Sequence, residues 1–263
     1  MKSSDPTTNL SDTARRARLR LLQMHHAAGV GHIGGNLSAL DALLVLHHRV
    51  MTPADRFILS KGHAAGALYV TLWSTGELQE SDLEQFHAEG SKLSGHPAAG
   101  WTEGIRFATG SLGHGLPVSA GVALARKLEG REGRVFCLCS DGEWQAGSNW
   151  EALIFAARQQ LASLVILVDV NGLQGFGTTE EVGGIENLAD RFEAFGIPTR
   201  ECDGHDAEAL EAELVADRPG PRAVLLNTVK GKGVSFMEDR LEWHYLPLDD
   251  ELYERARREV EQS

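Results

Sequence analysis

The sequence predicts an α/β protein in which helices cover both faces of a mostly parallel sheet. Short, continuously apolar segments such as VFCLC, LVILV and AVLLN alternate with segments of helical periodicity. Strands that are apolar on both faces are typical of parallel sheets buried between helical layers. The 263 residues, 42% of them hydrophobic, suffice for one three-layer α/β/α domain, and we expect a single domain over residues 1–263 because no repeat or linker divides them.

In the first half of the chain, apolar spacing and cap residues predict helix 11–28, helix 38–50, strand 55–59, helix 64–75 and helix 81–86. Ser11 and Ser38 are the expected caps of the first two helices. Residues 1–10 are polar and are expected to form a tail. Residues 90–115 are rich in glycine and histidine and show little periodicity, which is typical of a functional loop.

The second half alternates regularly and predicts helix 116–128, strand 134–139, helix 149–160, strand 164–169, helix 187–195, strand 199–201, helix 206–216, strand 223–228 and helix 249–261. Open parallel sheets bind ligands beyond the carboxyl ends of their strands. The first candidates for a site are therefore the segments that directly follow strands, namely 60–63, 140–142, 171–173 and 230–233.

Composition excludes several classes of protein. A formal net charge of −12 provides no basic field that would attract nucleic acid or an anionic membrane. No apolar run approaches the roughly 18 residues of a membrane span, and the N-terminus does not have the pattern of a secretory signal. The three cysteines are an odd number without a C-x-x-C pair, which fits neither a disulfide framework nor a zinc knuckle. We expect a cytoplasmic protein.

The strongest chemical signal is a carboxylate and a carboxamide at the ends of successive strands. Asp141 and Gly142 follow one strand, and Asn171 follows the next. Mg²⁺ prefers oxygen ligands and usually keeps phosphate in its shell, and the turn after Asn171 can direct the carbonyl of Leu173 toward the same cation. Because Gly142 has no side chain, its N–H can approach a phosphate closely.

This Asp-Gly step, the 28 intervening residues 143–170 and then Asn171 resemble the thiamine-diphosphate fingerprint. Further segments resemble the transketolase family over roughly residues 15–260, namely GHIGGN with His32, SKGH with His63, SGHP with His96, TGSLGHG around Gly110, and NTVKGKG followed by EWH with His244. The resemblance is to the amino-terminal, diphosphate-binding part of that family.

The resemblance implies thiamine diphosphate and Mg²⁺ as cofactors. The implied metal ligands are Asp141, Asn171 and Leu173. The implied cofactor-binding residues are His63, Gly110, Ser111, Leu112, Gly142, Asn171 and His244. The implied catalytic residues, which meet substrate hydroxyls or move protons, are His32, His96 and His244. Glu151 is implied as an acid at the dimer interface.

Three positions depart from the family pattern. Ser111 and His114 replace proline and glutamine in the T-G-P-L-G-Q-G segment, and Ala146 stands where many transketolases have a glutamate. The chain also ends before the domain that carries the glutamate activating the cofactor's pyrimidine ring. The resemblance therefore implies a split enzyme, a heterotetramer with a second subunit, that transfers a two-carbon ketol unit between sugar phosphates.

Two other functions stay open from the sequence. One is a thiamine-dependent subunit that decarboxylates a 2-oxo acid, and the other is a non-catalytic paralogue that binds the cofactor. Lys230 and Lys232 suit either contact with phosphate or a solvated loop. The remaining histidines are expected in surface or packing positions, namely His25, His26, His47, His48, His87 and His205.

Overall fold

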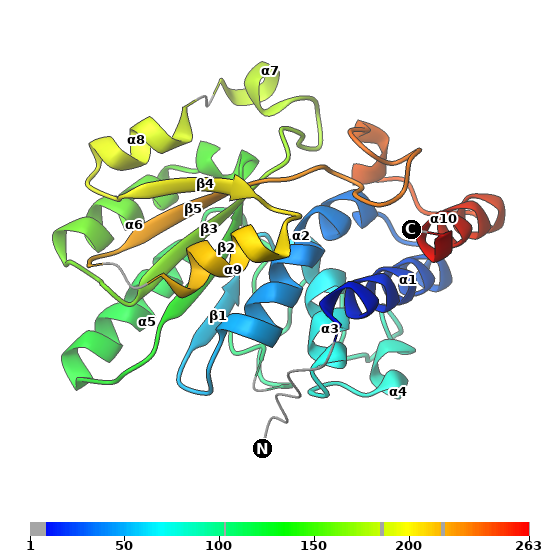
Figure 1. The fold of residues 1–263 in the computed structure, drawn as a ribbon, viewed down its shortest axis with the longest axis horizontal. Helices are drawn as coiled ribbons and strands as arrows, with labels where there is room; N and C mark the ends of the chain where they lie inside the picture. The colour runs from blue at the N-terminus through cyan, green and yellow to red at the C-terminus, as the bar shows by residue number, and fades with distance from the viewer. Residues whose placement is uncertain (1–8, 103, 185–186, 217–218, 263) are drawn as a thin grey trace.

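The computed structural model describes residues 9–102, 104–184, 187–216 and 219–262, and it confirms the predicted three-layer α/β/α fold (Figure 1). The sheet has the strand order β1-β2-β3-β5-β4, and every neighbouring pair is parallel. Its strands are β1 (Arg56–Leu59), β2 (Val135–Ser140), β3 (Leu164–Val170), β4 (Thr199–Asp203) and β5 (Arg222–Asn227).

Alternate side chains of the strands enter two apolar cores, one on each face of the sheet. Phe136 and Leu138 of β2 belong to the core beneath α1 (Leu10–Ala28), α2 (Ile33–Val45), α3 (Ala65–Ser74), α9 (Ala207–Val215) and α10 (Asp250–Gln262). Cys137 and Cys139 of the same strand enter the core beneath α5 (Gly115–Glu129), α6 (Gly147–Arg158) and α8 (Leu188–Ala194). The continuous apolar strands of the sequence are thus explained by burial on both sides.

Most predicted element bounds agree with the structure to within two residues. The helix predicted over 81–86 is the shorter α4 (Glu80–Leu83), and α7 (Thr179–Gly183) was not predicted. Short turns of 3₁₀ helix lie at Gly62–Ala64, Gly142–Gln145 and Leu241–His244. Of the predicted tail 1–10, residues 1–8 lie outside the described residues.

The second helix differs most from the prediction. It begins at Ile33, five residues before Ser38, and a π-helical turn Leu46–Val50 follows its end. Ser38 is not a cap: it is buried inside α2, and its hydroxyl donates to Asp169 at 2.6 Å. The segment GGN resembles a loop because glycine weakens helices. Gly34 is nevertheless helical, and a Cβ there would lie 3.2 Å from Trp243, so close packing accounts for the glycine.

The first helix also has a different cap from the one predicted. Asn9 precedes α1, and its side chain accepts a hydrogen bond from the N–H of Ser11 at 3.1 Å. Within the described ranges, no helix combines the length and the apolar character needed to cross a membrane.

Candidate functional site

A cavity of about 260 Å³ opens at the carboxyl ends of the strands and gathers most of the predicted site residues. The predicted residues that line it are His32, His63, His96, Gly110, Leu112, Asp141, Gly142, Asn171, Leu173 and His244. They come from segments spread over more than 200 residues of the chain, because each loop follows or faces the end of a strand. Ser111 and Glu151 are exposed and are not part of the lining.

Asp141 follows β2 and is almost completely buried. Its carboxylate accepts the backbone N–H groups of Gly142 and Gly172, each at 2.7 Å. Burial, and after it the charge of Asp169, raise the pKa of Asp141 to about 6. Because the ionised carboxylate is destabilised in this position, a bound cation would stabilise it.

Asn171 and Leu173 lie beside this carboxylate at the end of β3. The side-chain oxygen of Asn171 accepts the N–H of Leu173 at 3.1 Å, and its amide nitrogen lies 3.3 Å from the hydroxyl of Ser38. The carbonyl of Leu173 accepts a hydrogen bond from Lys230 at 3.3 Å. This carbonyl is therefore already directed toward a cationic group.

Four histidine rings lie close together in the cavity. The ring centroid of His32 lies 5.7 Å from that of His63, 6.1 Å from His96 and 5.3 Å from His244. The rings of His63 and His244 are 5.8 Å apart. The resemblance-based grouping of these histidines thus corresponds to one cluster in space.

The histidines of this cluster favour the uncharged form. Burial, followed by the charge of Lys61, lowers the pKa of His63 well below its usual value. Burial and the charge of Lys230 lower the pKa of His244 to about 3. Burial also lowers the pKa values of His32 and His96. Neutral imidazole can donate at one nitrogen and accept at the other, which suits contacts with hydroxyl groups.

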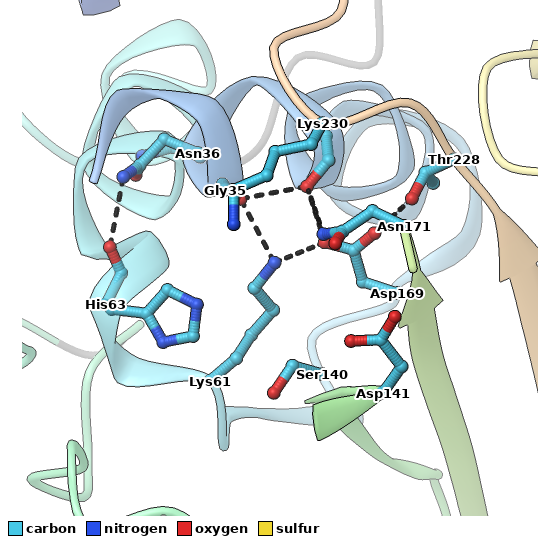
Figure 2. Close-up of polar contacts among 12 residues, drawn as sticks. Gly35, Asn36, Lys61, His63, Ser140, Asp141, Asp169, Asn171, Thr228 and Lys230 are labelled. Carbon is cyan, nitrogen blue, oxygen red and sulfur yellow. Dashed lines mark hydrogen bonds and ion pairs between the residues drawn. The ribbon is translucent and has the colours of Figure 1, made fainter. Parts of the chain in front are cut away.

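A buried polar layer supports the floor of the cavity (Figure 2). Lys61 and Asp169 form an ion pair with no exposed side-chain surface. The ammonium group of Lys61 also donates to the carbonyl of Gly35 at 3.0 Å, and Thr228 and Ser38 both donate to Asp169. Sequence reasoning missed this pair, because Asp169 resembles the end of an apolar strand and Lys61 part of a loop.

Sequence reasoning also missed Gln174 and Tyr245, which line the cavity, and left Lys230 undecided. Lys230 is buried, and its ammonium lies 2.9 Å from Nδ1 of His244, so the solvated-loop alternative is wrong for this residue. Because a charged ammonium can only donate, His244 accepts at Nδ1 and carries its proton at Nε2. The NTVKGKG pattern was the available signal for Lys230.

The loop that carries Gly110 and Leu112 is held by a second buried acid. Glu143 accepts the N–H of Gly113 at 3.2 Å and the hydroxyl of Ser60 at 2.5 Å. The small side chain of Ala146 packs against Gly113, where a Cβ would collide with it. His114 is exposed and lies outside the cavity lining. Ala146 is therefore matched to the close approach of this loop.

Among the described residues, no three His, Cys, Asp or Glu side chains form a metal-binding group. A metal in this cavity would take amide and backbone oxygens together with the carboxylate of Asp141. The remaining predicted packing positions agree with the structure for His25 and His47, which are buried in the interior.

Comparison with known proteins identifies the family. The family model described as the thiamine diphosphate binding domain of transketolase matches residues 11–261. One of the two subunits of the apulose-4-phosphate transketolase of Actinobacillus succinogenes is 39% identical over 91% of this chain and 91% of its own length. The 6-deoxy-6-sulfo-D-fructose transketolase subunit SqwG of Clostridium sp. is 34% identical over 99% of both chains.

The solved structures show the same relationship. The transketolase of Campylobacter jejuni superposes with a TM-score of 0.88 at 30% identity, over 96% of this chain but 42% of that one. The chain thus spans nearly the whole of the relatives that are named as subunits, and less than half of that solved transketolase. These matches show that the chain belongs to the transketolase family, in which it corresponds to the thiamine diphosphate binding domain.

Proposed function

We propose that this chain is the cofactor-anchoring subunit of a two-subunit transketolase that transfers a two-carbon ketol unit between sugar phosphates. The proposal rests mainly on the cavity in which Asp141 and Asn171 share a lining with four histidines. A destabilised carboxylate suits a cation, and neutral imidazoles suit a substrate rich in hydroxyl groups. One ligand that needs both is a metal-bound diphosphate cofactor next to a sugar.

The residues of the cavity fit thiamine diphosphate with Mg²⁺. Asp141, Asn171 and Leu173 would hold the metal through oxygen atoms, the ligand type that Mg²⁺ prefers. Gly142 has an ordinary backbone conformation, and a Cβ there would lie at a normal 3.4 Å from Gln174. Since the protein itself does not require a glycine at this position, the space beside it is available for a phosphate group.

The site residues would have separate tasks. The groups that would hold the cofactor are His63, Gly110, Ser111, Leu112, Gly142, Asn171 and His244. His32, His96 and His244 would bind substrate hydroxyls and transfer protons at them, because each imidazole is uncharged and has a donor and an acceptor. When bound, thiamine diphosphate supplies the electron sink for breaking the carbon–carbon bond.

The mouth of the cavity offers a surface for a partner. Leu112, Phe176 and Tyr245 line the cavity and are 41%, 84% and 55% exposed. Large apolar side chains gathered in this way are typical of a surface that another protein covers. We infer that the partner carries the pyrimidine-binding domain and that the assembly is a heterotetramer, with the exposed Glu151 of α6 at the contact between copies.

The proposed substrate class follows from the relatives rather than from the cavity alone. They are named for a sugar phosphate and for a sulfo sugar. We therefore propose a ketose with a terminal anionic group as the donor. The free cysteines Cys137, Cys139 and Cys202 support a reducing, cytoplasmic location. The decarboxylase and non-catalytic alternatives are not favoured, since the relatives are named transketolase subunits.

The proposal is tested by assaying ketol transfer from xylulose 5-phosphate with the complex of this chain and its co-expressed second subunit. Thiamine diphosphate and Mg²⁺ are supplied, and the chain alone is the control. We expect transfer by the complex and none by the chain alone. Tight cofactor binding without transfer would contradict the proposed substrate class, and pyruvate-type donors would then be compared.

A further inference from the structure

The backbone segments that carry His32 and His63 are joined by one buried side chain, that of Asn36. Its amide nitrogen donates to the carbonyl of His32 at 2.8 Å and to the carbonyl of His63 at 3.0 Å (Figure 2 shows the second bond). Its oxygen accepts the N–H of Ala67 at 2.7 Å. Asn36 has no exposed surface, and both of its N–H donors are used.

Asn36 replaces a hydrogen bond of the first turn of α3. In a regular helix the N–H of Ala67 would donate to the carbonyl of His63, four residues earlier. Here the amide of Asn36 lies between these two groups and bonds to both. The cap residue Ala64 offers no side-chain hydrogen bond, so the first turn of α3 is capped from α2. The position of His63 therefore depends on a residue of another helix.

The same amide fixes the segment of His32. This residue has a left-handed backbone with φ of 67°, which is uncommon for a residue with a side chain. Its N–H donates to the carbonyl of His244 at 3.0 Å, and its carbonyl accepts from Asn36. The backbone of His32 is thus held from both sides, between the segment of His244 and that of His63.

We propose that Asn36 is a positioning residue that fixes His63, on the cofactor side of the site, relative to His32, on the substrate side. The inference rests on the proposed roles of those two histidines. Asn36 does not touch the ligands; it sets the separation of the two rings through their backbones. Loss of its amide lets the two segments move independently.

The test compares Asn36→Leu and Asn36→Ser with the matched control Thr71→Val in the co-purified complex. Thr71 is equally buried and also bonds to Ala67, through its hydroxyl and the Ala67 carbonyl at 2.8 Å, but it touches neither histidine segment. The dissociation constant of thiamine diphosphate is measured calorimetrically with Mg²⁺, together with kcat and KM for xylulose 5-phosphate. The urea midpoint of each variant reports its stability.

We expect Asn36→Leu to weaken cofactor binding by about 10- to 100-fold, the usual effect of removing a group that orients a ligand-binding side chain. Asn36→Ser keeps one donor and should fall between Asn36→Leu and the native residue. Thr71→Val should lower the urea midpoint and leave the dissociation constant unchanged. In a His63→Ala background, Asn36→Leu should have little further effect on cofactor binding, because it acts through His63.

Three outcomes would overturn the inference. Equal losses of cofactor affinity in Asn36→Leu and Thr71→Val would mean that Asn36 only stabilises the fold. Additive effects of Asn36→Leu and His63→Ala would mean that it does not act through His63. Normal binding by both Asn36 variants, with weakened binding by His63→Ala, would overturn the inference alone, whereas normal binding by His63→Ala would overturn the proposed role of His63 as well. If Asn36→Leu does not fold, Asn36→Ser decides between the same outcomes.

Discussion

Lys61 and Asp169 form a fully buried ion pair beneath the candidate site, between the loop after β1 and the end of β3. The charge of Lys61 lowers the pKa of Asp169, against the effect of burial. Because Asp169 also accepts from Ser38, which contacts Asn171, the pair supports the side chain proposed to bind the metal. A charge balance beneath the cavity thus contributes to its geometry.

Removing one partner of this pair should strongly destabilise the protein. Lys61→Met leaves a buried carboxylate without its cation, and we expect a loss of about 3–5 kcal/mol in the free energy of unfolding. The double variant Lys61→Met/Asp169→Asn should regain part of this loss, since no isolated charge remains. Urea unfolding followed by tryptophan fluorescence measures both. A double variant no more stable than Lys61→Met would contradict the charge-balance argument.

Gly142→Ala should separate cofactor binding from stability. The added Cβ meets only an ordinary contact inside the protein, so we expect the free energy of unfolding to change by less than about 1 kcal/mol. The same methyl group would occupy space proposed for the diphosphate, and the dissociation constant of thiamine diphosphate should rise. Gly121→Ala, in an open position of α5, is the matched control. Unchanged cofactor affinity in Gly142→Ala would place the diphosphate elsewhere.

His25 should make the protein less stable in mild acid. It is completely buried, and burial lowers its pKa from 6.5 to about 4. The unfolded chain therefore takes up a proton that the folded protein refuses, so its contribution to stability is complete above pH 6.5 and is lost as the pH falls toward 4. We expect His25→Gln to lose about 3 kcal/mol less over this window, from the size of the shift. Urea unfolding at pH 7 and pH 4.5 measures the difference, and equal pH dependence in both proteins would exclude His25 as the cause.

Phe176 should contribute to binding of the second subunit. Its ring lines the cavity and is 84% exposed, so a covering partner would bury it. We expect Phe176→Ser to weaken association by about tenfold, which corresponds to about 1.4 kcal/mol. Leu128→Ser is the control, because Leu128 is 78% exposed in the last turn of α5, at the opposite edge of the sheet. Sedimentation velocity of the mixed subunits distinguishes the two variants, and equal association constants would argue against a partner at the cavity mouth.

The strands were predictable because burial on both faces leaves a direct record in segments such as LVILV. The start of α2 was not, because Gly34 resembles a loop residue until its close contact with Trp243 is known. Ser38 resembles a cap for the same reason: its true partner, Asp169, lies 131 residues away along the chain. Local patterns do not carry contacts of this range.

The candidate site followed a similar rule. Asp141 and Asn171 were identifiable because they directly follow strands whose ends must lie at one edge of the sheet. The tasks of Asn36 and Lys61 were not, since each depends on buried backbone or side-chain partners contributed by other elements. Motifs indicate which residues meet the ligand, and the structure shows which residues hold them in place.

The most direct test of the central claim is a calorimetric titration of thiamine diphosphate into the two-subunit complex, with Mg²⁺ and again with EDTA. The native complex and the variants Asp141→Ala and Asp190→Ala are compared; Asp190 is an exposed acid of α8. We expect Mg²⁺-dependent binding by the native complex and by Asp190→Ala, and none by Asp141→Ala. Equal binding by all three proteins, or binding that EDTA does not reduce, would contradict a metal-anchored cofactor at the ends of β2 and β3.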